Sequence, residues 1–333
     1  MSGIKIFVSH RIDIESELIN NPIYVPVRCG AVFDDKNSMH ILGDDTGEHI
    51  SERRMSFCEF TVQYWAWKNW NADYYGLCHY RRYLSFSQRR FKTDEYNMIY
   101  TPSLTPGAKK RFGLLDRPAM ETFISGCDGV VSEYAEVSRI PTPKGKQKTV
   151  RAMWEAYDGE FLVKQSIDLL FQLIDEMAPE YSQSAREYFE GTVHRGFNCF
   201  VLKKELFERL CQLQFPIMFE VEKRLDTTGY TQTMLRTPAF LGEILYGIFL
   251  YHITVHEQWN IQTCQLVFFR NTERIKSRAD LLRRCLRDRI DHCLRGIADP
   301  IFPKGSRRRE QLKYIFYRTT AAQQRGVAQI NEK

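Results

Sequence analysis

Three residues suited to chemistry follow an apolar stretch directly: His79, Arg81 and Arg82, in the segment HYRRY at 79–83. The apolar stretch at 74–78 predicts a buried strand, and open α/β sheets bind ligands beyond the carboxyl ends of their strands. Arginine stays charged and binds phosphate oxygens in pairs, while histidine adds a donor or a titratable group. The pattern indicates a pocket for a doubly charged anion, with a solvated basic loop as the alternative. If the strand continues, Arg81 and Arg82 point to opposite sides and one faces the pocket.

Two carboxylates are candidates for a general base. Glu243 lies at the start of the apolar stretch FLGEILYGIF, where a helix dipole stabilises a carboxylate and a cleft would tune its pKa. Asp226, in RLDTTGY, is the second candidate, although it could equally cap the end of a helix. His194 and Asn198, in VHRGFNCF, flank the start of a predicted strand, where they either line a cleft or form an ordinary turn.

No metal site is predicted. The sequence contains no Asp-x-Asp pair of the kind that holds a divalent cation against a diphosphate. The acidic pairs at 34–35 and 44–45 diverge in an extended backbone, but a turn would bring either pair together. Because Mg²⁺ is often held by one or two carboxylates, Mg²⁺ or Mn²⁺ stays open as a cofactor. The nine cysteines form no C-x-x-C pair, and neither Walker A, G-x-G-x-x-G nor G-x-S-x-G occurs.

The elements that must position these residues are those of an α/β protein. By their apolar periodicity, strands are expected at 4–10, 74–78, 129–132, 198–202 and 265–270, and helices at 56–70, 153–189, 204–224 and 240–253. The order strand, loop, helix, strand at the beginning favours an α/β fold. The segment at 24–30 is restricted to an edge or a loop, because it contains Pro26.

The positive charge of the chain is concentrated at its carboxyl end. Residues 271–333 carry a formal net charge of +9 against +6 for the whole chain, so the preceding 270 residues are slightly acidic. We therefore divide the chain into a domain at 1–270 and a basic tail at 271–333, with an amphipathic helix around 279–297. Such a helix binds anionic lipid headgroups, or it packs as a cap with its arginines in water.

Composition also bounds the location and the partners. No apolar run reaches 18 residues, and the segment MSGIKIFVSH lacks the apolar region of a signal peptide, so we expect a cytoplasmic protein. The basic tail, with Tyr314, Phe316 and Tyr317, would also suit RNA. The body is slightly acidic, however, and no recognised nucleic-acid motif occurs, so no nucleic-acid partner is expected.

One long segment, residues 57–86, resembles the signature of a known family; it reads FCEFTVQYWAWKNWNADYYGLCHYRRYLSF. The family is the domain-of-unknown-function 4422 family, whose members are capsular-polysaccharide-type glycosyltransferases. The family carries a Cys-Glu helix with Tyr-Trp-Ala-Trp-Lys-Asn, followed by Gly-Leu-x-His-Tyr-Arg-Arg-Tyr. Here these are Cys58, Glu59, 64–69 and 76–83. The blocks YVPVRCGAVF, LGDDTGEHIS and FLGEILYGIFL are similar to further parts of the family, so the likeness extends over 5–251.

The resemblance implies a GT-A-like mixed sheet, flanked by helices, that binds a nucleotide sugar. It implies an enzyme that moves a sugar, of the galactose type, from a UDP-sugar to a capsule, O-antigen or lipopolysaccharide glycan, free or lipid-linked. A lipid-linked acceptor would bring the basic tail to the inner face of a membrane, which makes the protein peripheral there. The rival functions are a nucleic-acid-binding protein and a catalytically inactive subunit that binds a nucleotide sugar.

The same resemblance implies roles for single residues. His79, with Arg81 or Arg82, would neutralise the leaving diphosphate in place of a metal, because positive charge aimed at developing negative charge is a large catalytic effect. Glu243 would be the base of an inverting displacement, and Glu59 would support the site from a helix. The further residues expected to bind the nucleotide sugar are Ser9, His10, Asp44, Asp45, Tyr80, His194 and Asn198.

Overall fold

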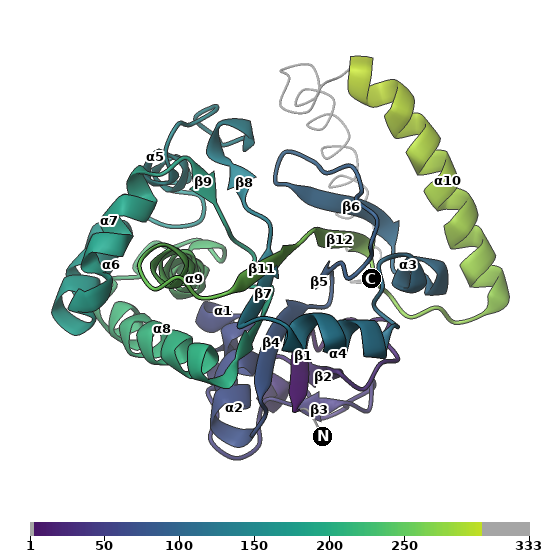
Figure 1. The fold of residues 1–333 in the computed structure, drawn as a ribbon, viewed down its shortest axis with the longest axis horizontal. Coiled ribbons are helices and arrows are strands. Elements are labelled where there is room, and N and C mark those ends of the chain that lie inside the picture. Colours follow the sequence, from purple (N-terminus) through teal and green to yellow (C-terminus); the bar gives the residue numbers. More distant parts are fainter. Residues whose placement is uncertain (1–2, 302–333) are drawn as a thin grey trace, which may run out of the picture. The chain divides into compact units, whose positions relative to one another are not determined.

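The computed structural model describes the backbone of residues 3–301 and the side chains of residues 3–290. The chain divides into two compact units, Met1–Ile275 and Lys276–Lys333, and each is described by itself. The first unit is built on a mixed sheet of ten strands with helices on both faces (Figure 1). This confirms the α/β fold that the order of elements predicts and the mixed sheet that the family resemblance implies.

The main path of the sheet runs in the order β11-β7-β10-β4-β1-β2-β3. Its strands are β1 (Ile4–His10), β2 (Tyr24–Arg28), β3 (Leu42–Gly43), β4 (Tyr74–His79), β7 (Gly129–Ser132), β10 (Phe200–Lys203) and β11 (Ile261–Cys264). The strand β1 pairs in parallel with β2 and β4, whereas β10 lies antiparallel between β4 and β7. Reversal of β10 brings the residues that precede it to the edge where β4 ends.

The other three strands of the sheet branch from the main path where β4 ends. They are β5 (Arg82–Leu84), β6 (Met98–Ser103) and β12 (Leu266–Asn271). The strand β5 pairs antiparallel with both β4 and β12, and β12 pairs in parallel with β6. A separate two-stranded ladder joins β8 (Ala135–Glu136) to β9 (Val193–His194).

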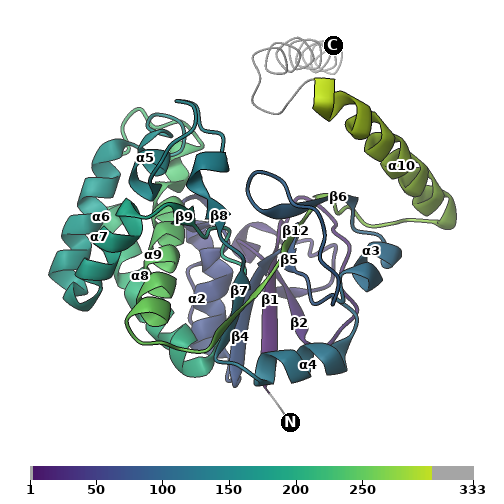
Figure 2. The same ribbon diagram turned by 45° about the horizontal axis from the view of Figure 1, so that its top comes forward.

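Helices cover the two faces of the sheet unequally (Figures 1 and 2). One face carries α2 (Phe60–Asn69), α5 (Val150–Glu155), α6 (Lys164–Met177), α7 (Ser182–Glu190), α8 (Lys204–Arg224) and α9 (Thr237–Val255). The other carries α3 (Pro106–Arg111) and α4 (Arg117–Ser125). Side chains cap the N-termini of three of these helices, α3, α4 and α5. The capping residues Thr105, Asp116 and Thr149 each accept a hydrogen bond from the backbone N–H three residues further along the chain.

Side chains alternate between two cores because successive strand residues face opposite sides of the sheet. Tyr75 and Leu77 of β4 pack in the core that contains α8 and α9, whereas Tyr74 and Cys78 pack in the opposite core. The residue two positions beyond Leu77 is His79. The period of the strand therefore turns His79 towards the face covered by α2, α8 and α9.

The expected elements differ from the observed ones where the backbone is unusual. The strands at 4–10 and 129–132 and the helix at 204–224 are confirmed. The helix expected at 56–70 is interrupted at Cys58 (φ 50°), which separates α1 (Arg54–Phe57) from α2. The strand expected from 198 begins at Phe200, because Phe197 (φ 74°) and Asn198 (φ 40°) are not extended.

Pro26 lies at a sheet edge, which is one of the two places expected for it, and the pairing of β2 explains why it is tolerated. It stands opposite Val8 of β1, while β3 pairs only with Val27 and Arg28. Within residues 3–301, the side of Pro26 that faces away from β1 therefore has no strand partner. It occupies a local sheet edge, as proline requires.

The helix α9 is apolar along its length and was expected from 240 onward. The segment Met234–Val255 is the one stretch within the described residues that is long and apolar enough to cross a membrane, and about two thirds of it is buried inside the protein. Residues of α9 such as Leu241, Ile244 and Phe249 pack in the core with α8. Its apolar composition is that of a core helix.

The second unit contains α10 (Arg278–Ile301). Its first turns are amphipathic, as predicted, and Leu282, Leu286 and Ile290 lie one helical turn apart with half or more of their surface exposed. The aromatic residues Tyr314, Phe316 and Tyr317 lie outside the described residues.

Candidate functional site

The chain reverses direction directly after β4. His79 pairs with Arg82 across an antiparallel turn whose two central residues are Tyr80 and Arg81. The strand therefore does not continue through residue 82. Arg81 and Arg82 were expected to face opposite sides only if it did. Instead, both guanidinium groups contact the ring of Phe268 on β12, at 5.5 Å for Arg81 and 5.7 Å for Arg82.

Neither arginine has a close ionic partner among the described residues, although the charges of Glu243 and Glu59 act on Arg82. Within the described part of the chain, no carboxylate forms a salt bridge with Arg81 or Arg82. The Nε atom of each is buried and has no hydrogen-bond partner there. Unpaired buried donors are costly, so they indicate a ligand that completes the site. A solvated basic loop paired with acidic neighbours would not look like this.

His79 stands beside these arginines as a neutral ring. Burial, followed by the charges of Arg82 and Arg81, lowers its pKa well below the ordinary value. The backbone N–H of Arg81 points at its Nδ1 from 3.4 Å. His79 therefore offers a hydrogen-bond donor to a ligand and leaves the positive charge to the arginines.

Two carboxylates lie near enough to Arg82 for their charges to act on it. Glu59 directly follows the interruption at Cys58, and Glu243 lies in the second turn of α9. Asn198 holds Glu59 through Nδ2 at 3.4 Å, and the backbone N–H of Phe197 donates to Oε1 of Glu243 at 3.0 Å. Both carboxylates interact electrostatically with Arg82. The site thus combines a cationic and an anionic side.

The pKa of Glu243 is raised. Burial is the main cause, and the N–H of Phe197 opposes it; the charge of Glu59 raises the pKa further, and Arg82 and Arg236 lower it. A carboxylate whose pKa moves towards neutrality is better suited to accept a proton than an ordinary glutamate.

Backbone strain gathers at this site. Cys58, Phe197 and Asn198 all have positive φ angles, which non-glycine residues rarely adopt. Each of them adjoins or holds one of the two carboxylates. Such strain persists when the surrounding structure enforces it, and it concentrates where side chains must be aimed.

The end of β1 borders the site. The carbonyl of Ser9 accepts a hydrogen bond from the N–H of Tyr80 at 3.0 Å, and the rings of His10 and Tyr80 lie 6.3 Å apart. Burial lowers the pKa of His10 to about 3, so its ring is neutral. Its Nδ1 is buried without a partner among the described residues.

Three further expected residues are engaged by other groups or exposed. Asp44 is fully buried, and its carboxylate accepts hydrogen bonds from the N–H groups of Gly30 and Ala31 and from the hydroxyls of Ser51 and Thr61. These four donors give it a structural role in the loop before α1. Asp45 is half-buried beside Gly43. Asp226 is exposed in the loop after α8, where it accepts from the N–H of Thr228 at 2.9 Å, as a turn residue does.

Two arginines that sequence reasoning missed belong to the site. Arg236, at the end of the short helix Met234–Arg236, donates to Sγ of Cys58 at 3.0 Å and interacts with Glu59 and Glu243. Arg195 lies 5.5 Å from the ring of Tyr134, and its Nε is buried without a partner among the described residues. Their positions in the sequence could have pointed to them, because Arg236 directly precedes α9 and Arg195 lies between His194 and Asn198.

His194 is linked to the base candidate through Gly196. A Cβ atom on Gly196 would collide with both Nε2 of His194 and Oε1 of Glu243. Burial lowers the pKa of His194 to about 4, and its Nδ1 lies 3.0 Å from the hydroxyl of Tyr188. Glycine at position 196 is what allows the two polar groups to converge.

No metal centre emerges from the described residues, which contain no cluster of three or more His, Cys, Asp and Glu side chains arranged to hold an ion. One member of each acidic pair is already engaged by the protein: Asp34 pairs with Arg28 at 2.9 Å, and Asp44 accepts four internal hydrogen bonds.

The fold and the site together define a mixed α/β protein with two arginines and two carboxylates beside the end of β4. Residues 5–255 match the family described as a domain of unknown function (DUF4422), and the chain belongs to that family. A solved structure titled as the apo form of WbbM, a bifunctional glycosyltransferase, shares the fold with a TM-score of 0.73 at 26% identity. The match covers 81% of this chain and 46% of the other, so this chain spans less than half of that protein. No curated protein matches the chain.

Proposed function

We propose that this protein is a glycosyltransferase that moves a sugar from a nucleoside diphosphate sugar to a glycan acceptor. The observation that carries the proposal is the pair Arg81 and Arg82 at the end of β4, both without a salt-bridge partner among the described residues. The carboxylates Glu59 and Glu243 act electrostatically on Arg82. The likeness to a glycosyltransferase structure supports the same class of reaction.

The arginines suit the leaving group of this reaction. When the bond between the sugar C1 and the diphosphate oxygen breaks, negative charge develops on the diphosphate. Arg81 and Arg82 would neutralise it from a recessed site, where charge interactions are stronger than in water. Their planar guanidinium groups also fit the paired oxygens of a phosphate. His79 would add a neutral donor to the same group.

Glu243 would act as the base. In an inverting displacement, the acceptor hydroxyl attacks C1 from the side opposite the leaving diphosphate, and its proton passes to the carboxylate. The raised pKa of Glu243 and its fixed Oε1 suit that role. Glu59, held by Asn198, would position the donor sugar through its hydroxyl groups.

The donor and the setting are narrower parts of the proposal. A UDP-linked hexose of the galactose type is the donor that the family resemblance favours, with a capsule, O-antigen or lipopolysaccharide glycan as acceptor. The enzyme would work in the cytoplasm at the inner face of a membrane. The exposed leucines of α10 and the arginines beside them support contact with anionic lipid.

Thermal unfolding with UDP and UDP-sugars, in the presence and absence of EDTA, tests the proposal. A ligand that binds only the folded state raises the melting temperature. We expect a rise with UDP that survives EDTA and is lost in Arg81→Ala. Arg117→Ala is the matched control, because Arg117 is an exposed residue of α4 paired with Glu121.

The outcomes separate the alternatives. A rise that EDTA abolishes would place a metal in the site and overturn the role of the arginines. A rise without transfer or hydrolysis of any UDP-sugar would identify an inactive binding subunit. The absence of any rise would contradict the proposed function.

A further inference from the structure

A pocket with a volume of about 190 Å³ lies between the loop after β5, the helix α4 and the end of β11. Its lining combines aromatic rings with hydroxyl, amide and guanidinium groups, among them Phe86, Phe123, Ser87, Gln88, Arg89 and Thr263. A cavity of about 150 Å³ is enough to hold benzene, so this pocket has room for one six-membered ring. It is smaller than the roughly 300–1,000 Å³ of pockets for drug-sized ligands.

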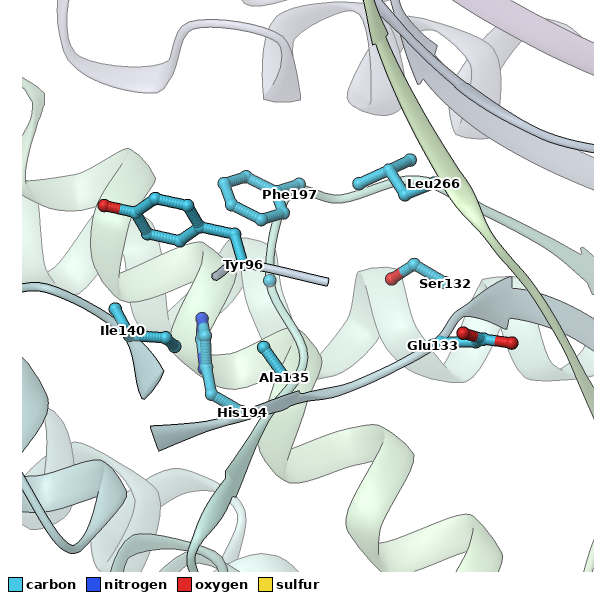
Figure 3. A pocket seen from close by; sticks show the side chains of 9 residues that line it. Tyr96, Ser132, Glu133, Ala135, Ile140, His194, Phe197 and Leu266 are labelled. Carbon is cyan, nitrogen blue, oxygen red and sulfur yellow. The ribbon is translucent and has the colours of Figure 1, made fainter. Parts of the chain in front are cut away.

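The neighbouring hollow beside Phe197 has no such room. Tyr96, Ile140 and His194 surround it (Figure 3), and its volume of about 10 Å³ is enough for a single water molecule at most. Glu133, at the end of β7, lines both spaces, and in Figure 3 its carboxylate points away from the rings of Tyr96 and His194. Of the two, the pocket beside α4 is therefore the one that can hold a ring.

The loop that forms one wall of this pocket is fixed at both ends. At its start, the N–H of Ser85 donates to the carbonyl of Gln265 at 2.8 Å. At its end, the backbone of Phe91 exchanges two hydrogen bonds with the side chain of Gln265, at 2.9 and 2.8 Å. A bidentate salt bridge between Arg90 and Glu133, at 2.8 and 3.0 Å, links the loop to β7. The pocket is therefore preformed, which lowers the entropic cost of binding a ligand.

The charge of the pocket favours an anionic ligand. Glu133 is the one acidic residue among the described residues that line it, and Arg90 already binds its carboxylate. Arg89, at the exposed rim, forms no salt bridge with a carboxylate of the described residues, and its backbone N–H donates to Oγ of Ser87 at 3.2 Å. A guanidinium group that is left unpaired can bind a carboxylate or a phosphate through two parallel hydrogen bonds.

The aromatic part of the lining suits the apolar face of a sugar ring. Phe123 on α4 has 40% of its surface exposed, and the ring of Phe86 meets it edge-to-face at 6.1 Å. Ser87, Gln88 and Thr263 offer hydroxyl and amide groups on the same walls, which can donate to and accept from sugar hydroxyls. An aromatic surface bordered by a few polar groups is a lining that fits a pyranose.

The position of the pocket relates it to the site at the end of β4. Ser85 follows Arg82 by three residues, which is a path of about 10 Å at the usual rise of a strand. The antiparallel strand β10 lies between β4 and β7, and β11 runs parallel to β7, so β4, β7 and β11 all end at one edge of the sheet. A glycan whose terminal hydroxyl reacts beside Arg82 can therefore reach the pocket with a more distant ring.

We propose that this pocket is a remote subsite for the acceptor glycan and holds one pyranose ring that carries a carboxylate or a phosphate group. The ring would pack its apolar face on Phe123, and its anionic group would bind Arg89. This inference rests on the proposed function for its assignment to the acceptor, and it names the class of acceptor as an acidic glycan. The subsite would keep the growing chain bound while its end is extended.

Ligand-observed NMR on the UDP-saturated protein tests the subsite without turnover, because UDP occupies the arginines at the end of β4. The probes are methyl glucuronide, glucose 6-phosphate and methyl glucoside, at about 10 mM because single rings bind weakly. We expect a saturation-transfer signal for at least one anionic probe and a weaker signal for methyl glucoside. Arg89→Gln should weaken binding of the anionic probe about tenfold. Ala119→Trp should abolish it by filling the pocket, which Ala119 lines from the exposed side of α4.

A pair of matched truncations provides the control. Phe123→Ala and Phe33→Ala each remove an exposed phenylalanine ring, but Phe33 follows β2, which lies near the other end of the strand order from β11. The signal should fall in Phe123→Ala and persist in Phe33→Ala. The UDP-induced rise in melting temperature should persist in all of these variants, because none of them alters the residues at the end of β4.

The outcomes separate the subsite from the proposed function. The stronger of the two anionic probes identifies the anionic group as a carboxylate or a phosphate. Absence of a signal for both, or an equal signal in the wild type and Ala119→Trp, overturns the subsite while the UDP response stands. Equal signals for the anionic and neutral probes overturn the acidic ligand. Absence of the UDP response in the wild type overturns the proposed function, and the assignment of the pocket to an acceptor with it.

Discussion

The backbone N–H of Phe197 donates a 3.0 Å hydrogen bond to Glu243, and Phe197 holds a φ of 74° while doing so. Residues 197 and 198 lie just before β10, where the reversed strand brings them opposite the end of β4. The same strained pair therefore holds both carboxylates of the site, Glu243 through the backbone and Glu59 through the side chain of Asn198. The strained backbone at 197–198 therefore positions the carboxylates of Glu59 and Glu243.

Asn198→Gly should separate stability from function. Glycine adopts the φ of 40° without strain, so the free energy of unfolding should stay within about 1 kcal/mol of the wild type or rise. The hold on Glu59 is lost, and kcat/KM should fall by roughly tenfold or more. Urea denaturation and transferase kinetics on the same preparation check this. A variant with unchanged kinetics would show that Asn198 is a turn residue only.

Glu243→Gln should lower turnover by about 10²–10⁴-fold, the usual contribution of a general base. UDP should bind at least as well, because the substitution removes a negative charge beside Arg82. Glu243 must be deprotonated to accept a proton and its pKa is raised, so the wild-type rate should fall as the pH drops towards that pKa. The acid limb should be missing in the variant. Transfer at the wild-type rate would contradict the role of Glu243.

Buried neutral histidines should make stability depend on pH. His194 titrates near pH 4 in the folded state, and its unfolded pKa is about 6.5, so the unfolded chain binds a proton first as the pH falls. Its stabilising contribution is present above pH 6.5 and is lost on acidification towards pH 4, by about 1.4 kcal/mol per pH unit. Glu243 works in the opposite direction, since its folded pKa is raised.

Comparison with His194→Gln isolates this effect. The difference in the free energy of unfolding between wild type and variant, measured by urea denaturation, should shrink steadily from pH 6 to about pH 4.5. A difference that is constant over this range would mean that His194 has the same pKa in the folded and unfolded chains.

The tail should carry membrane affinity. Deletion of 276–333 should release the protein from anionic vesicles, and Leu286→Glu should weaken sedimentation with them, because Leu286 is exposed on the apolar side of α10. Neutral vesicles are the control, since basic residues gain from anionic headgroups. Equal vesicle binding by the truncated and full chains would contradict the peripheral location.

Local pattern was enough to predict several elements and part of the site. Three features depend only on neighbouring residues, and the structure has them where expected: the apolar strand at 74–78, the helix at 204–224 and the cationic HYRRY segment. His79, Arg81 and Arg82 were found because an anion site at a strand end is a short-range signal. The breaks at Cys58 and Phe197 were not foreseen, because a strained φ is imposed by distant contacts rather than by the residue type.

Asp44 shows the limit of residue type most clearly. An acidic pair in a polar loop looks available for a ligand, yet four donors from 30, 31, 51 and 61 surround it in the fold. Conversely, the position of Arg236 before α9 does not reveal its partner, because the packing of α9 against α1 brings it to Cys58. The chemistry of each residue follows from its type, but which side chains meet in one site depends on how distant strands pair. Because β10 runs antiparallel to β4, Asn198 lies near His79, and it and its neighbour Phe197 hold Glu59 and Glu243.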